Sequence, residues 1–238
     1  MIDINDFRSF VLFVANKVGF RDNITPSNFN MLAKRALMEW TIKQTGNEEE
    51  YQPGRPIPRK TYEATKRIME NLKHLKVPHE FMAGNTGRIP IPDGTGVDYI
   101  GQPAGKLFYT SSLRLMFGSD EYDAKLMTDE EMGKIIGSAI LKPTITHPAY
   151  TMYSDYVQVF PKNPFRVKWT YLRYPKTPIW AYTLQNGRPV YDSSLSTDLD
   201  APEDAENKIA MMMLSYLGIN MREQEVIAYS EMKQDKGV

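Results

Sequence analysis

Apolar residues at the start of the chain repeat with helical spacing. Between residues 6 and 18 they recur three or four positions apart, as on one face of an amphipathic helix, and Gly19 is placed to stop it. A second helix is predicted from Thr25, which can cap, and Pro26, whose fixed φ suits a first turn, to about Gly46. The buried face of this second helix is predicted to consist of Phe29, Leu32, Ala33, Ala36, Leu37 and Trp40.

Two stretches rich in glycine and proline interrupt this pattern. Residues 47–59 carry three successive glutamates and then three prolines, so they cannot continue a helix and are predicted to form an exposed loop. Helical spacing returns at Tyr62 and lasts until Pro78, which predicts a third helix. Residues 84–105 contain six glycines and three prolines, and this composition favours a projecting loop with short extended pieces.

The middle of the chain changes from helical to strand patterns. Residues 106–116 are typical of a strand, and residues 128–131 have the capping-box spacing that opens a short helix. From residue 148 to 191 the chain is rich in β-branched and aromatic residues, which alternate with polar ones in places. The dipeptide Asn186-Gly187 indicates a hairpin turn. We therefore expect an antiparallel sheet here.

The chain is predicted to return to helix near its end. Residues 200–203 again have capping spacing, and apolar residues follow at helical spacing until Gly218. A final helix is predicted over residues 222–233.

The order of helices, then strands, then helices predicts an α+β fold, because a parallel doubly wound sheet would need alternating strands and helices. We expect one domain spanning residues 1–238. Its helical bundle would combine residues 1–78 with residues 200–234, and its β-rich antiparallel part with long loops would be formed by residues 79–199.

Composition narrows the classes of function. Apolar residues make up 42% of the chain, which is ordinary for a globular protein. Lysine plus arginine and aspartate plus glutamate number 29 each, so the net charge is zero and no global field favours binding to nucleic acid or to an anionic membrane. A neutral chain is also poorly protected from self-association. The absence of cysteine excludes disulfides, thiolate nucleophiles and cysteine-ligated metals.

No export or membrane signal is visible in the sequence. The apolar run within residues 1–20 is interrupted by charged residues and is not followed by a small-residue cleavage site. No segment approaches the roughly 20 apolar residues of a membrane span. We expect synthesis in a cytoplasm, without export.

The candidate catalytic and metal-binding patterns are incomplete. Residues 101–106 resemble a phosphate-binding loop, but one residue is missing between the glycines and Leu107 replaces the hydroxyl that would bind magnesium. The histidines, His74, His79 and His147, are too oddly spaced for a metal site. No serine lies in a Gly-x-Ser-x-Gly frame. The paired carboxylates Asp120–Glu121 and Glu130–Glu131 could serve as acid and base, but surface turns and helix caps explain them more simply. We predict no catalytic residue, no metal, no cofactor and no enzymatic activity.

The richest candidate feature is a run of aromatic residues interleaved with Arg166, Lys168 and Arg173. Its aromatic members are Trp169, Tyr171, Tyr174, Trp180 and Tyr182. Such a set could stack nucleic-acid bases, form a protein interface, or pack as the core of a sheet. Zero net charge weighs against nucleic acid. The candidate subunit-interface residues are therefore Tyr171, Arg173, Tyr174, Trp180 and Tyr182.

Two blocks of the sequence resemble a family of phage proteins. The first block comprises residues 7–19 and 24–30. The second comprises residues 142–144, Pro148, and residues 157–161, 171–175, 178–180, 217–219 and 222–223. Their order and spacing are similar to those of virion structural proteins of crAss-like and related short-tailed phages of Bacteroidota, among the head-to-tail connector or tail-ring (adaptor) subunits. The resemblance covers about the first 45 and the last 100 residues.

This resemblance implies a role rather than an active site. It implies a homo-oligomeric ring of about twelve copies in the neck or tail of the virion, assembled in the cytoplasm of the bacterial host. Its partners would be the portal protein and other tail or ring proteins, and genomic DNA would pass through the channel without sequence-specific binding. The resemblance implies no membrane partner. The alternatives are another minor virion protein, such as a tail-fibre adaptor or minor capsid protein, and more distantly a small hydrolase that uses surface carboxylates.

Overall fold

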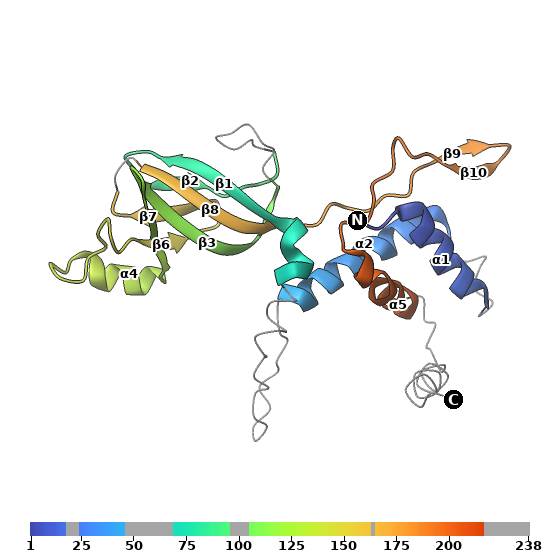
Figure 1. Cartoon of the computed structure of the whole chain (residues 1–238), viewed down its shortest axis with the longest axis horizontal. Coiled ribbons are helices and arrows are strands. Elements are labelled where there is room, and N and C mark those ends of the chain that lie inside the picture. Colours follow the sequence, from blue (N-terminus) through green and yellow to red (C-terminus); the bar gives the residue numbers. More distant parts are fainter. Residues whose placement is uncertain (18–23, 46–68, 96–104, 163–164, 217–238) are drawn as a thin grey trace, which may run out of the picture. The chain divides into compact units, whose positions relative to one another are not determined.

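A computed structural model describes residues 1–17, 24–45, 69–95, 105–162 and 165–216. The chain divides into two compact units. The helical unit comprises Met1–Asn71 and Pro175–Val238, and the sheet unit comprises Leu72–Tyr174. Helices and largely antiparallel sheets occur together, which confirms the predicted α+β class (Figure 1).

The helical unit contains the two helices predicted near the start of the chain. Helix α1 spans Ile4–Lys17, and it begins before the first predicted position because the Asp3 carboxylate accepts hydrogen bonds from the backbone N–H groups of Asn5 and Asp6 (2.7 and 3.0 Å). Helix α2 spans Pro26–Thr45, and the Thr25 hydroxyl accepts from the N–H of Asn28 at 3.3 Å. All six residues of its predicted buried face are buried.

The core of the helical unit combines helices with a non-helical segment. Helices α1, α2 and α5 (Glu206–Tyr216) contribute to it, and Trp180 and Leu199 fill it from the segment 175–201. Backbone bridges join Ile2 to Leu199 and Ile179 to Thr197. A bundle made of the terminal helices alone is therefore not evident. The sequence had grouped residues 175–199 with the β-rich part, but this segment belongs to the helical unit, where Trp180 and Leu199 are buried.

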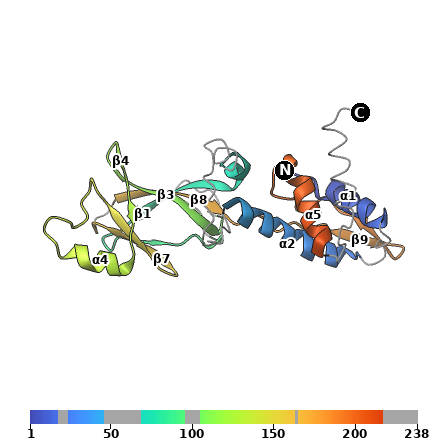
Figure 2. The ribbon, with the colours of Figure 1, turned by 90° about the horizontal axis from the view of Figure 1, so that it is seen from below.

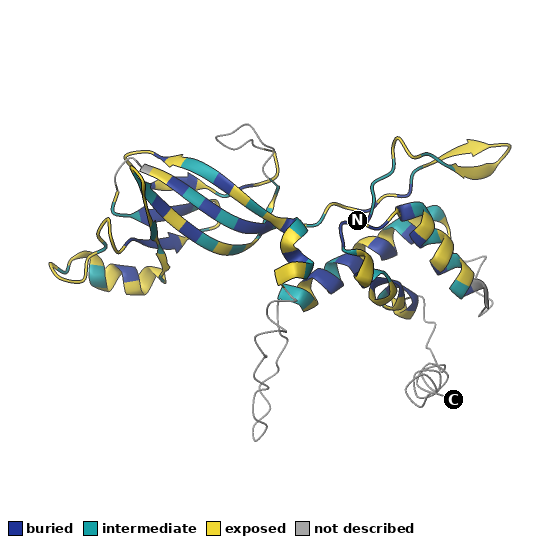
Figure 3. Cartoon of the chain, in the orientation of Figure 1, coloured by how far each residue is buried: buried dark blue, intermediate teal, exposed yellow. Residues whose placement is uncertain are grey.

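The predicted hairpin is confirmed and belongs to the helical unit. Strands β9 (Tyr182–Gln185) and β10 (Arg188–Tyr191) pair antiparallel. Asn186 and Gly187 have φ values of 51° and 75°, the left-handed conformation that a two-residue type I′ turn requires. Almost every residue of the two strands is exposed (Figure 3).

The sheet unit is built from two four-stranded sheets, seen in two layers in Figures 1 and 2. The first is antiparallel and has the order β1 (Lys76–Ala83), β8 (Phe165–Arg173), β3 (Leu107–Phe117) and β4 (Asp120–Asp123). The second has the order β2 (Arg88–Pro90), β7 (Tyr156–Phe160), β6 (Ala149–Met152) and β5 (Lys125–Leu126), and only β5 and β6 run parallel.

The two sheets share one hydrophobic core. Its buried residues are Ala83, Ile89, Leu113, Leu115, Tyr150, Val157, Val159, Val167, Trp169 and Tyr171. The predicted capped helix is confirmed as α4 (Asp129–Ile136): the Thr128 hydroxyl accepts from the N–H of Glu131, and the Glu131 carboxylate accepts from the N–H of Thr128 (3.3 and 3.0 Å). Local chemistry was sufficient to place this helix.

The predicted third helix is confirmed for residues 69–72, but its predicted end at Pro78 is wrong, and residues 62–68 lie outside the described residues. A 3-10 turn, η2 (Lys73–Leu75), is followed directly by strand β1, which runs through Pro78 and pairs with β8 along its whole length. Proline is tolerated there because β1 is an edge strand. One side of β1 has no neighbouring strand in its sheet, so a residue without a backbone N–H can be accommodated. Burial of His79 and Ala83 fixes which face of the strand meets the core.

Part of the predicted glycine and proline loop is ordered into the second sheet. Strand β2 lies within it and pairs with β7. Gly87 has φ +64°, and a Cβ there would lie 2.6 Å from the carbonyl oxygen of Val159, so only glycine fits this approach. The predicted loop 47–59 and the predicted helix 222–233 lie outside the described residues. No helix in the described part of the chain is long and apolar enough to span a membrane.

Candidate interaction surfaces

The five predicted interface residues divide between the two units. Tyr171, Arg173 and Tyr174 belong to the sheet unit, whereas Trp180 and Tyr182 belong to the helical unit. Tyr171 and Trp180 are buried within their units, so their side chains offer no surface to a partner. Tyr174 and Tyr182 are exposed. The aromatic run is thus part core and part surface.

Tyr171 is a core residue of the first sheet. Its ring stacks on His79 with centroids 5.4 Å apart and meets Trp169 edge-on at 5.9 Å. Its hydroxyl donates a hydrogen bond to the carbonyl oxygen of Gly105 at 2.9 Å, which ties β8 to the start of β3. A buried tyrosine needs such a partner for its polar end.

Arg173 and Tyr174 close the end of strand β8. The Arg173 guanidinium donates to the carbonyl oxygens of Tyr174 and His74 at 3.1 and 3.4 Å. The Tyr174 ring meets Phe108 edge-on, with centroids 4.9 Å apart, and the Lys106 ammonium lies 5.5 Å from its centroid. Tyr174 is therefore held in place while one part of its ring stays exposed.

Trp180 anchors the non-helical segment to helices α1 and α2. Its backbone N–H donates to the side-chain oxygen of Asn30 at 2.8 Å, and its carbonyl accepts from the same amide at 3.2 Å. Its indole N–H donates to the side-chain oxygen of Asn5 at 3.2 Å. The Arg8 guanidinium lies 4.0 Å from the indole centroid, and burial lowers the pKa of Arg8.

The β9–β10 hairpin carries exposed apolar side chains that sequence reasoning named only in part. Leu184 is 69% exposed, and Tyr182 and Val190 are also exposed. Within the described residues, the two strands pair only with each other, so both outer edges of the ribbon are open. The missed signal was the placement of apolar residues on a hairpin with no third strand beside it.

A second exposed apolar surface follows helix α4. Ile140 is 91% exposed, and Ile136, Leu141 and Ile145 are exposed with it. The Ser138 hydroxyl accepts from the backbone N–H groups of Ile140 and Leu141 at 3.3 and 3.1 Å, which gives the loop a defined turn. Four aliphatic residues in a stretch broken by glycine and proline could have revealed this surface.

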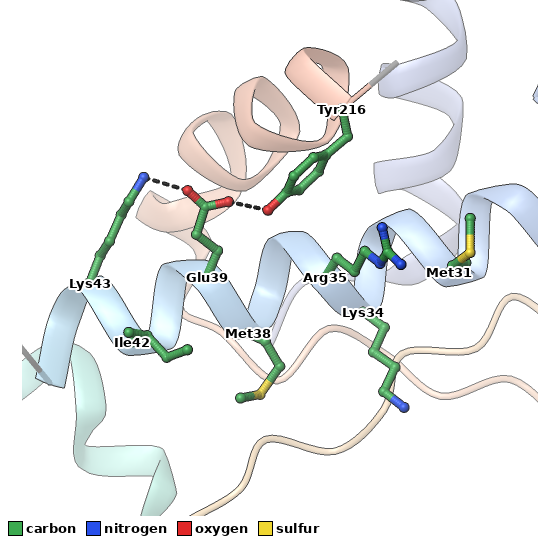
Figure 4. A pocket seen from close by; sticks show the side chains of 8 residues that line it. All are labelled: Met31, Lys34, Arg35, Met38, Glu39, Ile42, Lys43 and Tyr216. Atoms are coloured by element: carbon green, nitrogen blue, oxygen red, sulfur yellow. Dashed lines mark hydrogen bonds and ion pairs between the residues drawn. The ribbon is translucent and has the colours of Figure 1, made fainter. Parts of the chain in front are cut away.

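A third surface is a groove of about 710 Å³ along α2 beside α5. It is lined by Met31, Lys34, Arg35, Met38, Glu39, Ile42, Lys43 and Tyr216 (Figure 4). The Lys43 ammonium donates to the Glu39 carboxylate at 2.5 Å, and the Tyr216 hydroxyl donates to the same carboxylate. These hydrogen bonds, that from Lys43 foremost, lower the pKa of Glu39, and the bond to Glu39 raises the pKa of Tyr216.

The carboxylates considered as acid–base pairs have structural partners. Glu121 accepts from Lys168 at 3.2 Å and from Arg114 at 3.3 Å, and the hydrogen bond from Lys168 is the main cause of its lowered pKa. Glu130 accepts from Lys134 at 2.7 Å on helix α4, and Glu131 caps the same helix. These carboxylates serve ion pairs and a cap.

Comparison with known proteins adds no assignment to these surfaces. Neither the models of known protein families nor the curated proteins include a match to this chain. Among the residues that the structure describes, no group of three or more histidine, aspartate or glutamate side chains is placed to hold a metal ion. The exposed apolar and basic side chains are therefore the features from which a function can be argued.

Proposed function

We propose that this chain is a structural virion protein, a ring-forming subunit of a phage head-to-tail connector or tail that links portal and tail. The observation that carries the proposal is the β9–β10 hairpin, whose exposed apolar residues include Leu184. A two-stranded ribbon alone is marginally stable in water. Contact with a neighbouring chain would bury its side chains and stabilise it.

A closed ring requires two different patches on each subunit, because each copy contacts its neighbours head to tail. The hairpin supplies one apolar patch, and the loop after α4, with Ile140 at its tip, supplies another. In the proposed ring the helices pack around the channel, and β elements or loops reach the next ring. A net charge of zero suits a channel through which DNA passes without being gripped.

Assembly of the purified chain, alone and with its portal protein, tests this proposal by mass photometry and electron microscopy. We expect rings of about twelve copies. The variant Leu184→Ser should weaken assembly, and Leu195→Ser is a matched control because both leucines are 69% exposed and Leu195 lies outside the hairpin. A chain that stays monomeric, even with the portal, would refute the proposal.

Location in the virion separates the proposed role from that of another minor virion protein. A density for this chain between portal and tail is expected in a map of the particle. A density at a fibre base or in the capsid shell would instead identify a fibre adaptor or a minor capsid protein.

A further inference from the structure

Helix α2 has two faces. One face is buried in the core of the helical unit, and the groove lies along the outward face. Met31, Arg35, Met38 and Ile42 follow one another at spacings of four, three and four residues, which places them on one stripe of the helix. Figure 4 shows Met38, Ile42 and Lys34 together on the side of α2 that points away from Tyr216. This stripe is apolar with basic margins.

The groove carries a net positive charge, because its one carboxylate is already paired with a lysine of the groove. Glu39 accepts from Lys43 and from Tyr216, so its negative charge is already compensated. Lys34 and Arg35 form no ion pair with any residue that the structure describes. An occupant of this groove should therefore be apolar on one side and acidic beside it.

The same chain carries a surface with these properties in its other unit. Helix α4 begins with three acidic residues, Asp129, Glu130 and Glu131, and ends at the exposed Ile136. Asp129 and Ile136 lie seven residues apart, so they share one stripe of the helix, and Ile140 extends the apolar surface beyond it. Lys134 balances only one of the three carboxylates.

The two surfaces also agree in length. The stripe from Met31 to Ile42 extends about 16 Å at the rise of an α-helix, and the eight residues of α4 extend about 12 Å. An amphipathic helix lying in an apolar groove is a common mode of recognition between proteins. Helix α4 therefore fits within the groove, with its apolar loop continuing past one end.

We infer that the groove on α2 receives helix α4 of a second copy of this chain. Met38 and Ile42 would meet Ile136 and the loop after it, while Lys34 and Arg35 would face the acidic first turn. The contact joins two different patches, so it propagates from copy to copy and closes when the rotation allows. This inference rests on the proposed ring and names one contact between its copies, while the hairpin would take part in another.

Engineered cysteines test the contact, because the natural chain has none. One population carries Met38→Cys and a second carries Ile136→Cys, and the two are mixed under mild oxidation. A disulfide requires Cα atoms within about 7 Å, so a linked pair reports direct contact between copies. We expect linked dimers in the mixture and a ladder of linked oligomers when one chain carries both substitutions. The control replaces Met38→Cys with Leu195→Cys, which should not link.

Charge reversal tests the recognition separately from the covalent link. Lys34→Glu should raise the concentration needed for assembly by about fivefold, and Asp129→Lys in the same chain should restore it, because Lys134 already pairs with Glu130. Both residues are exposed, and we expect the fold to persist although Asp129→Lys removes an exposed hydrogen bond from the Tyr153 hydroxyl. Circular dichroism of each variant verifies this point.

The outcomes separate this contact from the ring itself. If the wild-type chain forms rings but the cysteine mixture does not link, the contact is wrong and the ring stands. If the mixture links but only open filaments form, the contact stands and the connector role fails. A link formed only within single chains, or a wild-type chain that never associates, overturns the inferred contact.

Discussion

Replacing Trp180 with alanine should destabilise the helical unit strongly. The indole is 3% exposed, and a buried tryptophan removes roughly 150–250 Å² from water. Its indole N–H donates to Asn5, and its ring lies under the Arg8 guanidinium, so both contacts are lost with it. The backbone bonds to Asn30 do not involve the side chain and can persist.

Truncation of a buried tryptophan to alanine costs about 3–5 kcal/mol, and this is the loss expected for Trp180→Ala. Tyr182→Ala is the matched control: Tyr182 stacks on the same indole but is 42% exposed, so a loss of about 1 kcal/mol is expected. Urea unfolding followed by circular dichroism gives both values. Hydrogen exchange should locate the loss in α1 and α2 and leave strand β8 protected.

Two results would refute this reasoning. A loss below about 1 kcal/mol for Trp180→Ala would mean that the segment 175–201 is held to the helices by other contacts. An equal loss for Tyr182→Ala would mean that the exposed end of the stack carries as much of the packing as the buried end.

Four further outcomes follow from local structure. Thr128→Ala should cost about 1 kcal/mol and raise amide exchange in α4, because the capping hydroxyl is lost. Gly187→Ala should destabilise the hairpin by about 1–2 kcal/mol, because Gly187 has a positive φ. Gly133→Ala should stabilise α4 by up to about 1 kcal/mol, because a Cβ at this position would meet nothing within 4 Å. The midpoints of urea unfolding test both values. The pKa of Glu39 is lowered in the folded chain. The stability that its ionised carboxylate contributes is therefore present above the pKa of an unfolded glutamate and is lost as the pH falls through the folded-state pKa. Amide exchange in α5 should rise over that pH range in the wild-type chain, but not in Glu39→Gln.

The sequence was sufficient where structure is decided locally. The buried face of α2 follows from apolar spacing, and the caps at Thr25 and Thr128 follow from hydrogen bonds within a few residues. The hairpin turn at Asn186 and Gly187 follows from the backbone conformation that these two residues tolerate.

The sequence was insufficient to predict the structure where contacts between distant segments determine it. Strand β1 forms because β8, about 90 residues later in the chain, pairs with it from Lys76 to Ala83, and no local pattern around Pro78 shows this. Trp180 has the composition context of a strand, yet it fills a helical core. The aromatic run could not be divided into core and surface until the fold placed each member.

The groove on α2 was missed for a related reason. Its outward stripe carries lysine and arginine among the methionines, so by sequence it resembles an ordinary solvated helix face. The groove also depends on Tyr216, which lies on α5, far from α2 in the sequence, and whose hydroxyl donates to Glu39.

The most direct test of the account is native mass spectrometry of the wild-type chain over a range of concentrations. The account predicts a closed oligomer with one copy number, about twelve, that persists on dilution until it separates into folded monomers. A single folded copy at every concentration, both alone and mixed with the portal protein, would contradict it.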